Sequence, residues 1–190
     1  MVDDALGNAF GGVLVSDFYA SYNHYAGLHQ RCWAHLLRAI HDLQALYPAD
    51  RRLKRWATRV QQRYRAAVAF SSPVERERLR AKRRFERGLL AVCQPFLADE
   101  RAPQRRLCLR IQRFLSELFV FVADPRVPAD NNAAERSLRH LVINRNISGG
   151  TRSSHGSDTK MVLATLFGTW RAQHLDPLLA SRNLLLSPQA

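Results

Sequence analysis

Two acidic residues stand where a carboxylate could bind a metal ion. Asp17 directly follows the run Gly11–Ser16, whose apolar and β-branched residues predict a buried strand. Glu135 lies in the first turns of a predicted helix, for which Asp130 has the character of an N-cap. Magnesium takes oxygen ligands, and paired divalent cations catalyse phosphoryl transfer. Carboxylates on two such rigid elements therefore indicate metal-dependent chemistry on phosphate esters.

The spacing of these residues alone favours a simpler interpretation. Asp17 could equally be a turn residue at the end of a strand. Glu135 could equally stabilise the start of its helix through the helix dipole. The residues around the two carboxylates must therefore decide between a structural role and a metal site.

Cys32 and His35 have the spacing of half a zinc site. The sequence holds no second pair with matching spacing, and Cys93 and Cys108 fall on apolar helix faces that predict core positions. A buried, hydrogen-bonded histidine is the alternative for His35. Three widely spaced cysteines argue against a disulfide framework and favour a reducing compartment.

The charge of the chain is concentrated in one segment. The 190 residues carry a formal net charge of +13. Residues 51–113 hold 19 Lys or Arg against 5 Asp or Glu, a net charge of +14 that exceeds the total. Nucleic acid is the usual partner of such a segment, although solvated basic faces over a core explain it equally well. No apolar run approaches the ~20 residues of a membrane span, so a membrane partner is not expected.

The hydrophobic pattern predicts an α/β fold in which the basic residues at about 48–125 are mainly helical. A second, weaker strand is expected near 28–33, and a helix over 34–46. Amphipathic helices follow, with breaks near 71–73 and between Pro95 and Pro103. Their aromatic residues, like Trp33 before them, are expected in the core rather than stacked on bases. Towards the end of the chain we expect a helix after Asp130, a Gly- and Ser-rich loop over 148–158, and a last helix over 159–173 that ends at Asp176-Pro177.

Three segments carry motifs in a fixed order. Together they resemble the second-aspartate motif, the Cys-Trp-Ala-His segment and the glutamate motif of DDE-type insertion-sequence transposases, with the insertion sequence 66 family as the best match. The segments read Val13-Leu14-Val15-Ser16-Asp17-Phe18-Tyr19-Ala20-Ser21-Tyr22-Asn23, Arg31-Cys32-Trp33-Ala34-His35-Leu36-Leu37-Arg38 and Asp130-Asn131-Asn132-Ala133-Ala134-Glu135-Arg136-Ser137-Leu138-Arg139.

This resemblance implies a partial ribonuclease H-like fold with Asp17 as the second acidic ligand and Glu135 as the third. It also implies that the basic helices at about 48–125 are an insertion before the last acidic residue. Mg²⁺ or Mn²⁺ is the implied cofactor. The resemblance places His35 near the scissile phosphate. Asn132 would either orient the metal ligand or bond to the start of its own helix. The implied reaction is cleavage of DNA at an element end, followed by strand transfer.

The resemblance also implies partners. Arg136 and Arg139 beside the glutamate, and Arg152 in the Gly-rich loop, are candidate contacts to DNA phosphates. Arg139 lies four residues after Glu135, so a local ion pair is its alternative role. The expected partners are transposon ends and target DNA, bound by a homo-oligomer. The expected location is the prokaryotic cytoplasm, in association with the nucleoid.

One feature departs from the family pattern. Only 12 residues precede Val13, too few for three strands and a first aspartate. Asp3 and Asp4 are poor substitutes, because they lie in a short polar lead. We therefore expect residues 1–190 to be the C-terminal part of a catalytic domain that is inactive on its own. Two alternatives stay open, namely a basic DNA-binding module without catalysis and a remnant that folds poorly.

Overall fold

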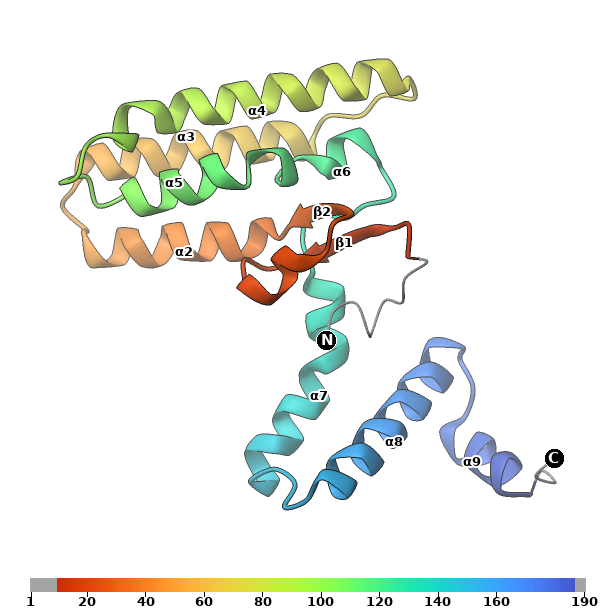
Figure 1. The fold of residues 1–190 in the computed structure, drawn as a ribbon. Helices are drawn as coiled ribbons and strands as arrows, with labels where there is room; N and C mark the ends of the chain where they lie inside the picture. The colour runs from red at the N-terminus through yellow and green to blue at the C-terminus, as the bar shows by residue number, and fades with distance from the viewer. Residues whose placement is uncertain (1–9, 187–190) are drawn as a thin grey trace. The chain divides into compact units, whose positions relative to one another are not determined.

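The computed structural model describes residues 10–186, and the chain divides into two compact units, Met1–Asn132 and Ala133–Ala190. Figure 1 labels the helices and strands. Asp3 and Asp4 lie outside the described residues. The first unit combines a small parallel sheet with helices, which is compatible with the expected α/β class. In the described part of the chain, no helix is both long enough and apolar enough to cross a membrane.

The sheet of the first unit pairs two short strands in parallel. Strand β1 spans Val13–Ser16 and strand β2 spans Leu28–Arg31, with Val13 opposite Leu28 and Ser16 opposite Arg31. Both predicted strands are therefore confirmed. A parallel pair needs a crossover connection, and here it is residues 17–27, which contain the short 3-10 helix η1, Ala20–His24. Both strands consequently end at the same edge of the sheet.

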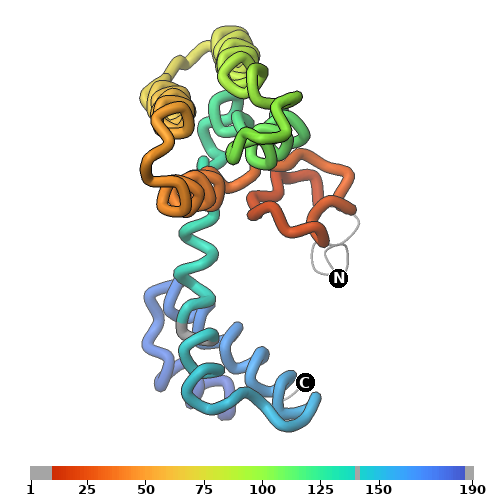
Figure 2. The backbone as a smooth tube through the Cα atoms, turned by 90° about the vertical axis from the view of Figure 1, so that its left-hand side faces the viewer, coloured from red at the N-terminus to blue at the C-terminus, as the bar shows by residue number. Residues whose placement is uncertain are grey.

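A stack of helices packs beside the sheet, and Figure 2 shows several of them nearly end-on. Helix α3 (Arg51–Val68) is anchored at its start by Asp50, whose Oδ1 accepts the backbone N–H groups of Arg52 (2.8 Å) and Leu53 (2.9 Å). The expected break near 71–73 separates α3 from α4. The elements are α2 (Trp33–Leu46), α3 (Arg51–Val68), α4 (Glu75–Leu97), α5 (Arg105–Arg113), the 3-10 helix η2 (Leu115–Glu117) and α6 (Val120–Ala123).

The expected helix break between Pro95 and Pro103 is confirmed, because α4 ends at Leu97 and α5 begins at Arg105. Helix α4 continues through Pro95 to Leu97. A proline this close to a helix end removes only one late backbone hydrogen bond, and the helix keeps Phe96 buried in the core. Downstream, the apolar stripe that follows Leu107 is divided among α5, η2 and α6.

One hydrophobic core joins the helices of the first unit. The apolar stripes predicted from residue spacing form this core. Helix α2 contributes Trp33, Leu36 and Ile40, and further residues come from α3, α4, α5 and α6. Trp33 is fully buried and stacks on Tyr64 with ring centroids 4.8 Å apart. The core positions expected for the aromatic and cysteine residues are confirmed, since Trp56, Cys93 and Cys108 are also buried. The neighbouring Cys93 thiol and burial both raise the pKa of Cys108.

The second unit is helical. Its helices are α7 (Asn132–Ser148), α8 (Ser154–Ala172) and α9 (Pro177–Leu186). The expected loop is shorter than 148–158, because Ser153 Oγ accepts the Gly156 N–H (3.1 Å) and starts α8 early. Asp176 caps α9 through its Oδ1, so Asp176-Pro177 begins a further helix as well as ending α8.

Candidate active site

Asp17 lies where β1 ends. Its carboxylate oxygen Oδ1 accepts the Tyr19 N–H at 2.9 Å, which closes a tight turn after the strand. Its backbone carbonyl accepts a hydrogen bond from Arg31 Nη1 at 2.9 Å. The side chain is half-buried. The carboxyl ends of parallel strands are where α/β sheets commonly bind ligands, so this carboxylate is both fixed and well placed.

Arg31 fixes the backbone around Asp17 from inside the protein. Arg31 is only 1% exposed. Arg31 Nε donates to Glu117 Oε2 at 2.6 Å, and Nη2 donates to Asn23 Oδ1 at 2.7 Å. The guanidinium also lies 4.6 Å from the ring centroid of Phe114. One buried side chain thereby ties together the end of β1, helix η1 and helix η2.

Asp17 and His35 line the same pocket of the first unit. Its volume is about 340 Å³. Helix α2 contributes His35, Arg38 and Asp42. Arg38 and Asp42 follow His35 by three and seven residues, so the three side chains lie on one face of the helix. Helix α5 contributes Arg110, whose guanidinium lies 5.4 Å from the ring centroid of Phe18. The pocket thus combines carboxylates, an imidazole and two guanidinium groups.

Hydrogen bonds bring the three motif segments together within the first unit. The Cys32 N–H donates to the carbonyl of Ser16 at 2.8 Å, which joins the second motif to the end of β1. The Asn131 N–H donates to Cys32 Sγ at 3.4 Å, and the Trp33 N–H donates to Ala129 O at 3.0 Å. Cys32 is completely buried. The start of the glutamate motif is therefore anchored where α2 begins.

Comparison with known proteins identifies the family of this chain. Residues 1–159 match the model of the family described as Transposase IS66 family. The chain belongs to this family. It is 30% identical over 164 residues to the "Uncharacterized protein y4jO" of Sinorhizobium fredii (strain NBRC 101917 / NGR234), a match that covers 83% of this chain. The chain spans 47% of that relative's length. No solved structure matches this chain significantly.

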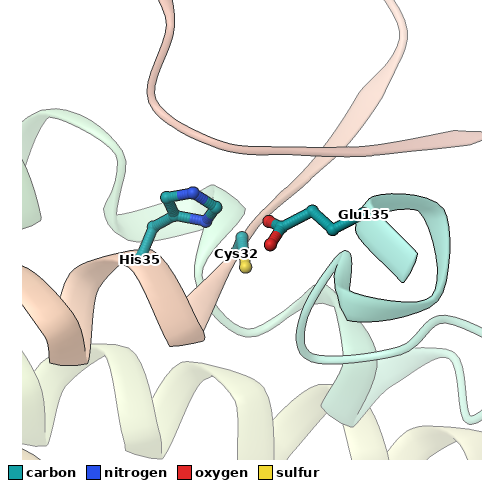
Figure 3. A group of neighbouring side chains, drawn as sticks. All are labelled: Cys32, His35 and Glu135. Carbon is teal, nitrogen blue, oxygen red and sulfur yellow. The ribbon is translucent and has the colours of Figure 1, made fainter. Parts of the chain in front are cut away.

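In this IS66-family chain the glutamate motif crosses the boundary between the units. Asn132 is the last residue of the first unit. Its N–H donates to Asp130 Oδ1 at 3.1 Å, which resembles the N-cap role expected of Asp130. Glu135 follows in the first turn of α7. Three residues of chain reach about 11 Å at most, which bounds the separation of the Glu135 and Asn132 Cα atoms. Figure 3 draws Cys32 and His35 at the start of α2, and Glu135 in α7.

The arginines expected to contact DNA belong to the second unit. Arg136 and Arg139 lie on α7, and Arg152 lies in the connection between α7 and α8. All three are exposed. Their predicted role stays a prediction.

Sequence reasoning missed three residues of the Asp17 pocket. Arg38 and Asp42 could have been found, because each is one or two helical turns from His35. Arg110 gave no such signal, since it reaches the pocket from α5, far along the chain in the basic insertion.

The buried His29 is expected to give this IS66-family fold a pH-dependent stability. Burial lowers the pKa of His29 from its ordinary value of 6.5, and nearby Arg31 acts in the same direction, while the hydrogen bond to Tyr25 and the charge of Glu117 oppose them. The unfolded chain therefore binds more protons below about pH 6.5. We expect the free energy of unfolding to fall as the pH drops through this region.

Denaturant unfolding of the chain and of its His29→Gln variant at a series of pH values measures this contribution. The amide of glutamine can still donate to Tyr25 but does not titrate. The variant should lose less stability than the original chain between neutral and mildly acidic pH. Identical pH profiles would show that His29 contributes nothing.

Proposed function

We propose that Asp17 and Glu135 hold divalent cations for phosphoryl transfer on DNA, as parts of an IS66-family transposase. The observation that carries this proposal is the convergence of the three motifs on the start of α2. Ser16, Cys32 and Asn131 are linked by successive hydrogen bonds in the first unit. A purely structural aspartate at a strand end would not require the glutamate motif to be anchored beside it.

The donors present fit a hard cation. Asp17 uses Oδ1 for the turn to Tyr19, and within residues 10–186 no hydrogen bond to its Oδ2 is found. Carboxylate oxygens are the ligands that Mg²⁺ and Mn²⁺ accept, usually one or two from the protein with the remainder from water and substrate. When bound, such cations activate a nucleophile and stabilise the leaving oxygen.

The protein's own cations would bind and orient the phosphodiester. Arg38 and Arg110 line the pocket that holds Asp17, and guanidinium groups match phosphate oxygens in geometry and charge. His35 lies in the same pocket and would assist in positioning the scissile phosphate. Asn132, at the start of α7, would orient the turn that carries Glu135. Arg136, Arg139 and Arg152 would contact the DNA backbone nearby.

The proposed fold is ribonuclease H-like, with α3 to α6 as the basic insertion. Support comes from β1, where an apolar run is only partly buried within the described residues although parallel sheets are normally covered on both faces. A larger sheet that extends past β1 would bury Val13, Leu14 and Val15. The proposed partners are transposon ends and target DNA, bound by a homo-oligomer in the prokaryotic cytoplasm in association with the nucleoid.

Electron paramagnetic resonance measures Mn²⁺ binding to the purified chain and so tests the metal site. Asp17→Asn and Glu135→Gln keep the side-chain shapes but remove a strong oxygen donor. Each should weaken Mn²⁺ binding at least about tenfold, because changes around a metal typically cost 10- to 100-fold in affinity. Asp124→Asn is the matched control, since Asp124 already pairs with Arg126 on the surface at 2.8 Å. Unchanged binding by the Asp17 variant would refute the proposed site.

A basic DNA-binding module without catalysis is the second candidate function, and the charge of +14 on residues 51–113 favours it. Binding of Mn²⁺ separates the two. The inactivity expected of residues 1–190 alone stays a prediction, which Mg²⁺-dependent cleavage of terminal-repeat DNA by the purified chain would contradict. DNA binding that persists in EDTA, in a chain that binds no Mn²⁺, would favour the module.

A further inference from the structure

Helix α4 carries a stripe of arginines on the side that faces away from the core. We call Arg76, Arg80, Arg83 and Arg87 the outer stripe of α4. Their spacings of four, three and four residues keep them on one face of the helix. The buried residues of α4, Ala81, Phe85, Leu89, Cys93 and Phe96, lie on the opposite face. All four arginines are exposed.

Within the described residues, the acidic residues of the same helix, Glu75, Glu77 and Glu86, form no ion pair with this stripe. Glu77 accepts a hydrogen bond from Ser72 Oγ at 2.6 Å, and Glu86 is paired with Lys82. Within residues 10–186, none of the four arginines forms an ion pair. The positive charge of the stripe is therefore available to a partner.

The stripe works against the stability of its own helix. Like charges three or four residues apart repel, and the outer stripe consists of three such pairs in succession. A helix that only needed a solvated face would alternate the signs of its charges, as the Lys82–Glu86 pair does. The pattern is thus better explained by an anionic partner than by solubility.

Two further arginines flank the stripe and are held by packing. Arg84 lies 5.2 Å from the ring centroid of Phe85 and 6.0 Å from that of Phe70. Arg63 of α3 covers Gly88, where an added Cβ would lie 3.4 Å from Arg63 Nε. Preorganised guanidinium groups lose less entropy when they bind phosphate. The seam between α3 and α4, which Figure 1 shows side by side, continues the basic surface.

The dimensions of the stripe match a nucleic acid strand. From Arg76 to Arg87 the helix rises about 16 Å, and one strand of duplex DNA presents a phosphate about every 3.4 Å along its axis. We propose that the outer stripe of α4 binds the sugar–phosphate backbone of duplex DNA, through residues separate from the Asp17 pocket. This inference rests on the proposed DNA substrate but not on the metal site.

The test measures binding of a fluorescent DNA duplex of arbitrary sequence at several salt concentrations, in EDTA, so that metal chemistry plays no part. The variant Arg80→Gln, Arg83→Gln, Arg87→Gln should bind more weakly. Its slope of log affinity against log salt should be shallower by about 2 to 3, because each phosphate that an arginine neutralises adds about 0.9 to the slope. Between about 50 and 200 mM salt, the original chain should then lose on the order of 40-fold more affinity than the variant.

A charge-matched control removes Lys54, Arg101 and Arg106 by the same change to Gln. These exposed residues lie towards the other end of the α3–α4 pair, where Arg52 contacts Asp99 at 2.9 Å. The control should keep the original slope, and Lys at positions 80, 83 and 87 should restore it. Circular dichroism confirms that each variant folds. Equal losses in the two Gln variants, or tighter binding of single-stranded RNA than of duplex DNA, would overturn the proposal.

Discussion

Replacing Arg31 by Met is expected to lower the free energy of unfolding by about 3–5 kcal/mol, the usual cost of removing one partner from a buried ion pair. The guanidinium is held inside the first unit by Glu117, Asn23 and the carbonyl of Asp17. Methionine fills part of the volume but donates no hydrogen bond. Four acceptors, Ser16 Oγ among them, lose a hydrogen-bond donor. Glu117, whose side chain is 28% exposed, keeps a charge without its counterion.

Guanidinium chloride unfolding at neutral pH measures this loss. Arg52→Met is the matched control, because Arg52 forms a similar bond to Asp99 with a side chain that is 56% exposed. An exposed pair of this kind contributes about 0–1 kcal/mol. Similar losses in the two variants would mean that the buried network of Arg31 is not what holds the end of β1. Such a result would also remove the physical reason to regard Asp17 as preorganised.

Replacing Trp33 by Ala should cost about 3–5 kcal/mol of unfolding free energy, the range typical of large aromatic residues in cores. Trp33 is fully buried, stacks on Tyr64 and lies 5.3 Å from the ring centroid of Phe119. Its indole N–H donates to the carbonyl of Leu118. The cavity would open next to Cys32, where the motif segments meet, so the loss should extend to the candidate site.

Trp33→Phe separates the two contributions. Phenylalanine keeps most of the ring contacts but leaves the Leu118 carbonyl with the weaker bond from Gln30 at 3.3 Å. We expect a loss of about 1–2 kcal/mol from that change. If the Ala variant is no less stable than the Phe variant, the packing of the indole ring does not hold α2 against η2 and α6.

The elements that the sequence predicts well are those with a strong local pattern. The valines of β1, the apolar stripe of α2 and the stripe of α3 each repeat at the spacing of their own element, and each matches the structure. Asp17 and His35 line one pocket, and their roles in a metal site stay predictions. Arg31 shows the limit of local patterns. Its partners stand 8, 14 and 86 residues away, so a buried role for a charged residue leaves no periodic signal.

The misplaced loop boundary has an equally local cause. A Gly- and Ser-rich stretch predicts a loop, yet Ser153 acts as an N-cap and draws the residues after it into α8. A single capping interaction here outweighs a modest intrinsic preference.

The crowded arginines of α3 and α4 also have a thermal consequence. Folding gathers cations that the extended chain keeps apart, and this self-repulsion destabilises the compact state. Added salt screens the repulsion over a Debye length of about 10 Å at 0.1 M. Ionic strength should therefore act in opposite directions on the two properties of this surface. It should raise the melting temperature of the first unit under the same conditions in which it releases DNA.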